Sequence, residues 1–285
     1  MAGLTQTTVF QGLPAVRLVA PDGASAIITL HGAHVVSWIP ASGRERLYLS
    51  ERSSLTAGSA IRGGIPVIFP RFATEEHAQG VPRHGFARTA EWQCIESRCG
   101  EDFSTTTLRL SDSPATRAVW PHAFAAELTA VVGGNRFDVE LEVENLGETA
   151  FSFTAALHTY LRVREVETVR IEGLHGAHYR DSARGPGEAD DTGEVLTVAE
   201  EVDRIYFGVA NPLLLRAPEG ATGIGSDGFP DVVVWNPWET KCAALADMPP
   251  DGFRRMLCVE AAVIGNPVHL EPAQAWWGRQ SLIAI

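Results

Sequence analysis

Two side chains able to transfer protons stand in strand-like stretches of otherwise apolar or small residues. In residues 151–161 one alternating set is apolar, while the other set is small or polar and includes His158. In residues 256–263 every residue except Glu260 is apolar. A carboxylate in such surroundings is unfavourable unless it is paired, and desolvation raises its pKa. The two residues are therefore candidates for a general acid and base. The structural alternatives are a hydrogen-bonded core histidine and an ion-paired glutamate.

A third candidate is a locally basic segment, residues 62–88, in a chain whose net charge is −12. It contains four arginines against two glutamates, a local charge of +2: Arg62, Arg71, Arg83 and Arg88 against Glu75 and Glu76. Arginine presents a planar fork that binds phosphate bidentately. Two such groups nearly neutralise a phosphomonoester, which carries roughly −1.5 to −2 at neutral pH. For any single arginine, a solvated surface side chain is the more common role.

Metal and cofactor signals are weak. The pairs His31/His34 and His175/His178 are spaced three apart, but on a strand such positions face opposite sides, and no acidic or cysteine partner completes a recognisable ligand set. Nucleotide-binding loops and the serine-hydrolase elbow are not found. We therefore expect neither a metal nor a cofactor. Several tryptophans could stack on sugar rings, although packing is the more common role.

The elements that must position these residues are β-strands. Residues 137–144 alternate apolar and acidic side chains, which is typical of a strand with one wet face. The Gly-Gly-Asn turn at 133–135 joins this stretch to residues 126–132 as a hairpin. Asp112, Ser113 and Pro114 predict the start of a short helix that runs through Trp120. Further strands are expected at 26–30, 33–38, 66–69, 104–110, 151–161, 195–198, 231–235, 256–263 and 281–285. Such a succession predicts an all-β antiparallel sandwich.

Length and composition limit the remaining possibilities. We expect residues 1–285 to form one domain, with a surface loop at 180–193. The acidic balance argues against nucleic acid as a partner. Four cysteines without a CxxC pair favour reduced thiols and a cytoplasmic protein. The sequence contains neither a recognisable signal peptide nor an apolar stretch of the ~20 residues that a membrane span needs.

Several motifs, in order along the chain, resemble the glucose-6-phosphate 1-epimerase group of the aldose 1-epimerase superfamily. They are GAHVVSW (32–38), IRGGIPVIFP (61–70), HGFAR (84–88), LHTY (157–160), DRIY (203–206), VWNPW (234–238) and CVE (258–260). The resemblance implies a galactose-mutarotase-like β-supersandwich of large antiparallel sheets with few short helices and an open cleft on its concave face. It further implies a monomer without a cofactor.

The same resemblance implies roles for individual residues. His158 would be the general acid and Glu260 the general base. Arg62 and Arg88 would hold a phosphate, and His84 and Asp203 would bind the sugar. Arg83 stands where the group commonly has glutamine, and adds a cation to the substrate site.

The expected function is therefore an isomerase that interconverts the anomers of an aldohexose 6-phosphate, with glucose 6-phosphate as the favoured substrate. One alternative is an aldose 1-epimerase that acts on unphosphorylated sugar, which the arginines argue against. A second is a non-catalytic carbohydrate-binding module, which leaves the acid/base pair without a role. A glycoside hydrolase is disfavoured because only Asp203 is available as a second carboxylate.

Overall fold

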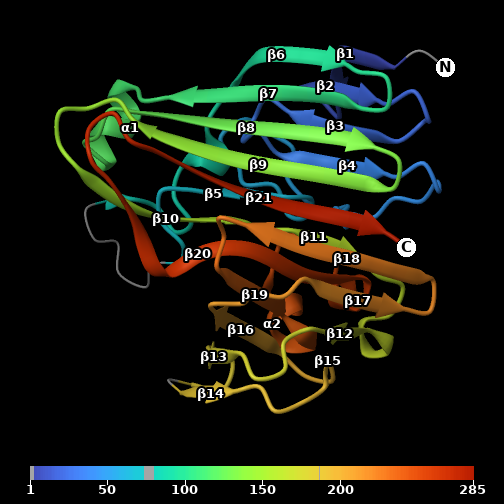
Figure 1. The fold of residues 1–285 in the computed structure, drawn as a ribbon. Helices are drawn as coiled ribbons and strands as arrows, with labels where there is room; N and C mark the ends of the chain where they lie inside the picture. Colours follow the sequence, from blue (N-terminus) through green and yellow to red (C-terminus); the bar gives the residue numbers. More distant parts are fainter. Residues whose placement is uncertain (1–2, 74–79, 186) are drawn as a thin grey trace.

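The computed structural model describes residues 3–73, 80–185 and 187–285, and its strands form three antiparallel sheets (Figure 1). The first sheet has the order β1-β2-β3-β4: Leu4–Phe10, Leu13–Val19, Ser25–Thr29 and Val35–Ile39.

The second sheet, which carries the candidate site, has the order β14-β13-β16-β19-β20-β10-β5, and β11 also pairs with β20. In chain order these strands are β5 (Val67–Ile68), β10 (Phe151–Leu157), β11 (Tyr160–Arg162), β13 (His178–Asp181), β14 (Glu188–Asp190), β16 (Val202–Phe207), β19 (Asp231–Asn236) and β20 (Met256–Leu270).

The third sheet has the order β15-β12-β17-β18-β21-β9-β8-β7-β6. In chain order its strands are β6 (Gln93–Cys99), β7 (Ser104–Ser111), β8 (Phe124–Gly133), β9 (Arg136–Asn145), β12 (Arg170–Glu172), β15 (Val195–Thr197), β17 (Leu213–Ala217), β18 (Gly220–Asp227) and β21 (Ala275–Ala284). The described helices are short: α1 (Pro114–Val119), α2 (Trp238–Ala244), η2 (Ala87–Thr89), η3 (Val166–Thr168) and η4 (Gly252–Arg255).

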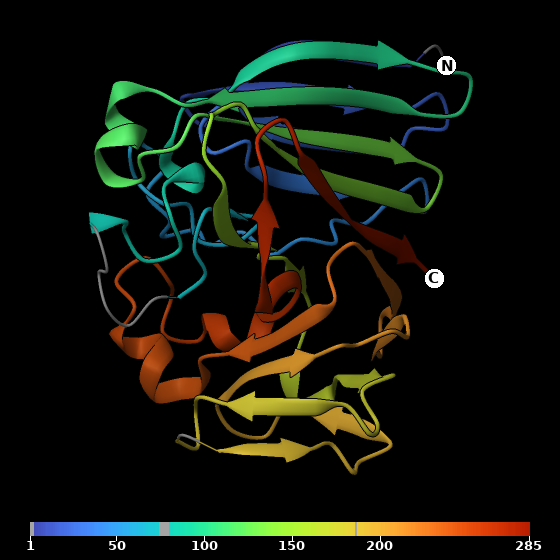
Figure 2. The same ribbon diagram turned by 60° about the vertical axis from the view of Figure 1, so that its left-hand side comes forward.

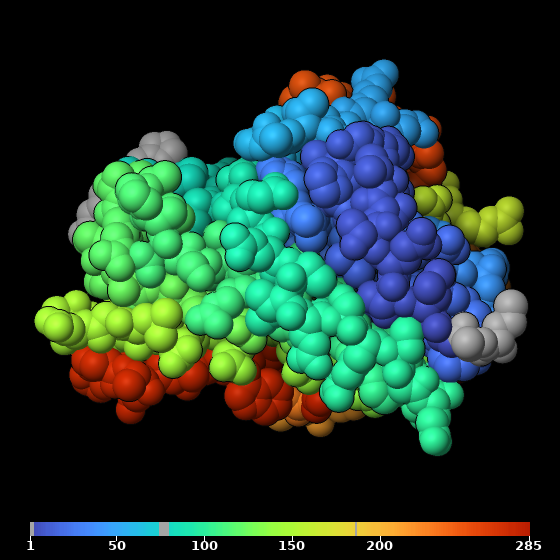
Figure 3. Space-filling view, turned by 90° about the horizontal axis from the view of Figure 1, so that it is seen from above, coloured from blue at the N-terminus to red at the C-terminus, as the bar shows by residue number. Residues whose placement is uncertain are grey.

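Aromatic side chains fill the space between the sheets. Trp38 of β4 stacks on Phe137 of β9 with ring centroids 5.7 Å apart, so the first sheet packs on the third. Phe153 of β10 meets Trp276 of β21 at 5.5 Å, so the second sheet packs on the third as well. Figures 1 and 2 show these layers from two sides, and Figure 3 shows the N-terminal strands beside β6 on the outer face. Large aromatic pairs of this kind contribute both apolar burial and favourable ring geometry.

Most of the expected elements are confirmed. In β9 the side chains of Phe137, Val139, Leu141 and Val143 are buried, as the alternation predicted, and β8 and β9 form the expected hairpin. Helix α1 begins with proline at its first turn, and Ser113 caps it by accepting a hydrogen bond from the Thr116 N–H. The all-β class is correct.

The prediction of a surface loop at residues 180–193 is wrong, because part of this stretch is β-strand. Strand β13 reaches into it and β14 lies within it, and the two strands pair at the edge of the second sheet. Their residues are mostly exposed, so the stretch has the polar composition of a loop although its backbone is paired.

All four cysteines are free thiols, with Cys94 and Cys99 exposed and Cys242 and Cys258 buried. Among the described residues, no helix has the length and apolar character required to cross a membrane.

Candidate active site

His158 and Glu260 come together because they are cross-strand neighbours. Leu157 at the end of β10 pairs with Ala261 of β20, and Tyr160 at the start of β11 pairs with Cys258. Both pairs belong to one antiparallel register, which places His158 opposite Glu260. Residues directly opposite one another project to the same face of a sheet. Sheet pairing therefore joins two side chains about a hundred positions apart in the sequence.

The two side chains are buried and in contact. The Nδ1 atom of His158 lies 3.3 Å from Oε1 of Glu260, and their side chains are 10% and 1% exposed. Within the described part of the chain, neither Nδ1 of His158 nor Oε2 of Glu260 has a hydrogen-bond partner. Buried polar atoms without partners are rare in folded proteins. A ligand that completes their hydrogen bonds would be favoured here.

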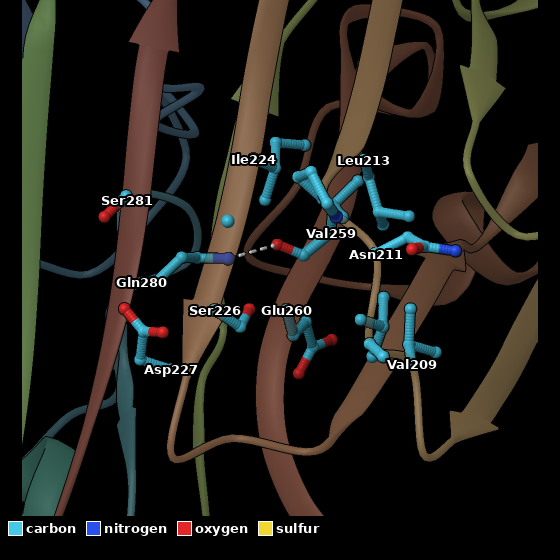
Figure 4. Close-up of a pocket in the computed structure, with 14 residues that line it drawn as sticks. Val209, Asn211, Leu213, Ile224, Ser226, Asp227, Val259, Glu260, Gln280 and Ser281 are labelled. Atoms are coloured by element: carbon cyan, nitrogen blue, oxygen red, sulfur yellow. Dashed lines mark hydrogen bonds between the residues drawn. The ribbon is translucent and has the colours of Figure 1, made fainter.

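A break between β10 and β11 presents His158. The Thr159 hydroxyl donates to Oε1 of Gln280 at 2.5 Å, and the Gln280 amide donates to the Val259 carbonyl at 3.0 Å, as Figure 4 shows for the second bond. Thr159 and Gln280 are both buried. Gln280 of β21 therefore connects the segment between β10 and β11 to β20. As a result, the third sheet as well as the second holds His158 against Glu260.

Rings on three sides fix the His158 imidazole. The Tyr160 ring stacks on it with centroids 4.8 Å apart and planes 10° apart. The rings of His84 and Trp235 meet it edge-on at 5.9 and 6.0 Å. The structure therefore brings His84, from the expected sugar-binding set, directly beside the pair.

Arg62 is linked to this cluster through Tyr160. Its Nη1 donates to the Tyr160 hydroxyl at 3.0 Å, while Nε and Nη2 each lie 3.1 Å from Oδ2 of Asp247. Asp247 thus partly compensates the charge of Arg62. Neither partner was expected from the sequence.

Arg88 and Arg83 lie on the same side of the site as His84. Nη2 of Arg88 donates to the Arg83 carbonyl at 3.1 Å, and Arg83 itself is exposed. Burial lowers the pKa of Arg88, and the positive charges of Arg62 and Arg83 act in the same direction. Burial and neighbouring positive charges disfavour the charged form of this guanidinium, so a bound anion would stabilise it. The two glutamates of this segment, Glu75 and Glu76, lie outside the described residues.

Asp203 joins the same face from β16. It pairs with Trp235 of β19, which pairs in turn with Cys258 of β20, so one row of side chains leads across the sheet. Lys241 Nζ lies 3.6 Å from an Asp203 oxygen. Burial raises the pKa of Asp203, and the Lys241 charge opposes that rise. Six of the seven expected site residues therefore lie on or beside one face of the second sheet. The seventh, Arg83, is exposed, but its positive charge acts on His84, Arg88 and Asp203.

The environment sets the protonation of the central pair. Burial lowers the pKa of His158 well below its usual value, and His84, Arg62 and Arg88 act in the same direction. Burial raises the pKa of Glu260 well above its usual value, and Asp203 adds to the rise. The unliganded pair therefore favours a neutral imidazole beside a neutral carboxyl group. Opposed shifts in two adjacent groups are characteristic of acid/base sites.

His34 and His178, from the two histidine pairs noted in the sequence, make contacts away from the acid/base pair. Nε2 of His34 lies 2.7 Å from the Gly63 carbonyl and so positions the loop that carries Arg62. His178 is exposed between Glu188 and Asp190. Neither the His31/His34 pair nor the His175/His178 pair belongs to the group of possible metal ligands found among the described residues.

The buried histidines predict acid sensitivity. Burial lowers the pKa of His34 to about 3 and that of His84 to about 3, so the unfolded chain binds more protons between pH 6.5 and 3. Their contribution to stability is present above pH 6.5 and is lost on acidification, at up to about 1.4 kcal/mol per pH unit for each. In urea unfolding between pH 7 and 4, His34→Gln should give a shallower loss of stability than the wild type. An identical pH slope in the two proteins would contradict this.

A cavity of about 240 Å³ lies on the β17–β18–β21 side of β20 (Figure 4). Glu260 and Val259 border it, but His158 does not. Of the two residues of the acid/base pair, only Glu260 therefore contributes to this cavity.

The sequence pointed to His158, Glu260 and the arginines, but not to three of their partners. Asp247 follows α2 in a segment without a recognisable pattern. Trp235 was one of several tryptophans with packing as the favoured role. Cys258 could have been recognised from its spacing, because a residue two positions before Glu260 on a strand projects to the same face.

Comparisons with known proteins agree with this architecture. Residues 14–282 match the family model described as aldose 1-epimerase. The chain belongs to the aldose 1-epimerase family, whose members act on sugars.

Two curated relatives carry the same name, "Putative glucose-6-phosphate 1-epimerase". The protein from Cenchrus ciliaris is 31% identical over 96% of this chain and 85% of its own. The protein from Escherichia coli K12 is 34% identical over 83% of this chain and 79% of its own.

Solved structures show the same fold. A structure described as a putative mutarotase from Salmonella typhimurium has a TM-score of 0.90 at 28% identity, and covers 99% of this chain and 93% of its own. A galactose mutarotase-like protein from Clostridium acetobutylicum has a TM-score of 0.78 at 15% identity, and covers 100% and 99%. The galactose-mutarotase-like fold expected from the motifs is confirmed, and the chain is an epimerase that interconverts sugar anomers.

Proposed function

We propose that this enzyme interconverts the α and β anomers of an aldohexose 6-phosphate, with glucose 6-phosphate as its substrate. The observation that carries the proposal is the contact between His158 and Glu260, 3.3 Å apart, with arginine charges acting on the same imidazole. The names of the curated relatives support the choice of substrate.

Mutarotation requires two coupled proton transfers. Glu260 as carboxylate removes the proton of the C1 hydroxyl, and His158 as imidazolium protonates the ring oxygen as the bond from C1 to that oxygen breaks. The resulting aldehyde rotates about the C1–C2 bond. Ring closure reverses both transfers, so the enzyme ends with its original protons. Transfers of this kind typically contribute ~10²–10⁴-fold each.

The phosphate can prepare the pair for this chemistry. The reactive form, carboxylate beside imidazolium, holds as many protons as the neutral form and differs by one proton moved from Glu260 to His158. Positive charge on Arg62 and Arg88 disfavours the imidazolium. A bound phosphate dianion offsets that charge and so favours the reactive form. Phosphate recognition and acid/base catalysis are then coupled through charge.

Arg88 is the principal phosphate ligand in this proposal. Arg62 already contacts Asp247 and Tyr160, whereas among the described residues the Arg88 guanidinium donates one hydrogen bond, to a backbone carbonyl. His84 and Asp203 would bind sugar hydroxyls, and the exposed Arg83 would add charge at the edge of the site.

Arg88→Ala should raise KM for glucose 6-phosphate about 10- to 100-fold, the value of one lost charge-assisted hydrogen bond. The loss should be specific to the phosphorylated substrate: exchange of free glucose should not fall, because the charge of Arg88 disfavours the imidazolium. Arg83→Gln is the matched control, with a smaller effect because Arg83 is exposed. The measurement is anomer exchange by magnetisation-transfer NMR on both sugars. An equal loss on both substrates would refute the phosphate assignment and favour an epimerase of unphosphorylated sugars.

We further propose that the protein acts as a cytoplasmic monomer. The free thiols support a reducing compartment, and the monomer follows from the family resemblance. Size-exclusion chromatography with light scattering tests the latter, and a stable dimer would refute it.

A further inference from the structure

A buried thiol that the proposed mechanism does not use lies beside the acid/base pair. Cys258 is two residues before Glu260 on β20, so both side chains project from the same face of the strand. His158, Cys258 and Glu260 each offer one donor atom, and the three atoms lie within 4.8 Å of one another. All three residues are buried.

Two of these donors have unused bonding capacity. Nδ1 of His158 and Oε2 of Glu260 are buried without a hydrogen-bond partner in the described residues. A buried donor or acceptor without a partner is unfavourable. A cation that coordinates the pair would remove this penalty.

The separations suit a tetrahedral ion. With metal–nitrogen and metal–oxygen bonds of about 2.0–2.1 Å and a metal–sulfur bond of about 2.3 Å, ligand atoms stand roughly 3.3–3.6 Å apart. The 3.3 Å between His158 Nδ1 and Glu260 Oε1 already meets this requirement. The widest separation in the cluster, at most 4.8 Å, closes by about 1 Å to meet it.

We propose that His158, Cys258 and Glu260 form a binding site for Zn²⁺ that blocks the acid/base pair. A donor set of nitrogen, sulfur and oxygen favours Zn²⁺ over Mg²⁺ or Ca²⁺, which prefer oxygen alone. Three protein ligands leave the fourth position to water or a substrate hydroxyl. The ion occupies both proton-transfer groups, so zinc acts as an inhibitor and not as a cofactor.

Zinc binding and zinc inhibition are separate claims. Binding depends only on the three donors, whereas inhibition also rests on the proposed catalytic use of His158 and Glu260.

The test uses the full chain with its exposed thiols removed (Cys94→Ser and Cys99→Ser) and Co²⁺ as a coloured substitute for zinc. We expect one equivalent of Co²⁺ with a thiolate-to-cobalt charge-transfer absorption that Zn²⁺ abolishes by displacement. The band should be lost in Cys258→Ser and retained in Cys242→Ser, the matched control with a buried thiol elsewhere. A band that persists without Cys258, or no Co²⁺ binding at millimolar concentration, would overturn the proposal.

Activity separates the two claims. For each protein, anomer exchange is compared with and without Zn²⁺ and after a chelator. Zinc should inhibit reversibly, and at least about tenfold more zinc should be needed in Cys258→Ser. If Co²⁺ binds through Cys258 but zinc leaves exchange unchanged, the metal site stands and the proposed roles of His158 and Glu260 fail. If exchange proceeds but no metal binds, the metal site fails and the proposed function stands.

Discussion

Replacement of the Glu260 carboxyl group by an amide (E260Q) is expected to slow anomer exchange of glucose 6-phosphate by ~10²–10⁴-fold. The amide keeps the shape of the side chain, but it cannot accept the C1 hydroxyl proton. Binding should persist because the arginines are unchanged. Magnetisation-transfer NMR measures the exchange rate, and titration calorimetry measures affinity for the sugar phosphate. Near-normal exchange in E260Q would exclude Glu260 as the base.

Stability provides the control for E260Q. Since burial raises the pKa of Glu260 in the folded protein, its ionisation opposes folding, and the wild type loses stability as pH rises above the ordinary carboxyl range. E260Q removes this loss, so its urea midpoint at pH 8 should equal or exceed that of the wild type. Glu96→Gln, on the exposed strand β6, should change neither exchange nor stability.

Removal of the imidazole in His158→Asn is expected to cause a loss of similar size, ~10²–10⁴-fold, together with a changed pH profile. In the proposed mechanism the wild type needs one proton shared by the pair, so its activity should fall when a second proton binds at low pH and when the last one leaves at high pH. His158→Asn retains only the carboxylate requirement, and its residual activity should rise with pH without an alkaline decline.

The pH profile separates a proton-transfer role from a structural one. A merely destabilised protein would lose activity yet keep the bell-shaped profile. His269→Asn, at an exposed position on β20, is the matched control and should retain both rate and profile. A bell-shaped profile in His158→Asn would contradict the role of His158 as the acid.

The fold was predictable where local pattern and burial coincide. Residues 137–144 alternate because one face of β9 packs in the core, and the Gly-Gly-Asn turn marks the β8–β9 hairpin. Strands without a clean alternation were missed: β6 is exposed along its whole length, and β13 and β14 are polar strands at a sheet edge. Their backbone pairing is set by neighbouring strands, a tertiary influence that local sequence does not report.

The candidate site was predictable because it contains ionisable residues within strands of apolar or small residues. Glu260 in an apolar strand and His158 on a small-residue face are unfavourable unless they are paired or have a function, and this made them visible in the sequence. Their direct pairing was not predictable, because it depends on the shared register of β10, β11 and β20. Asp247 and the Thr159–Gln280 bond also arise from contacts between distant segments.

The most direct test of the account compares anomer exchange by the wild-type enzyme on glucose 6-phosphate and on glucose under identical conditions. If the arginines bind the phosphate as proposed, kcat/KM for glucose 6-phosphate should exceed that for glucose by about 100-fold or more, the value of one or two charge-assisted hydrogen bonds. Equal or faster exchange of glucose would contradict the account.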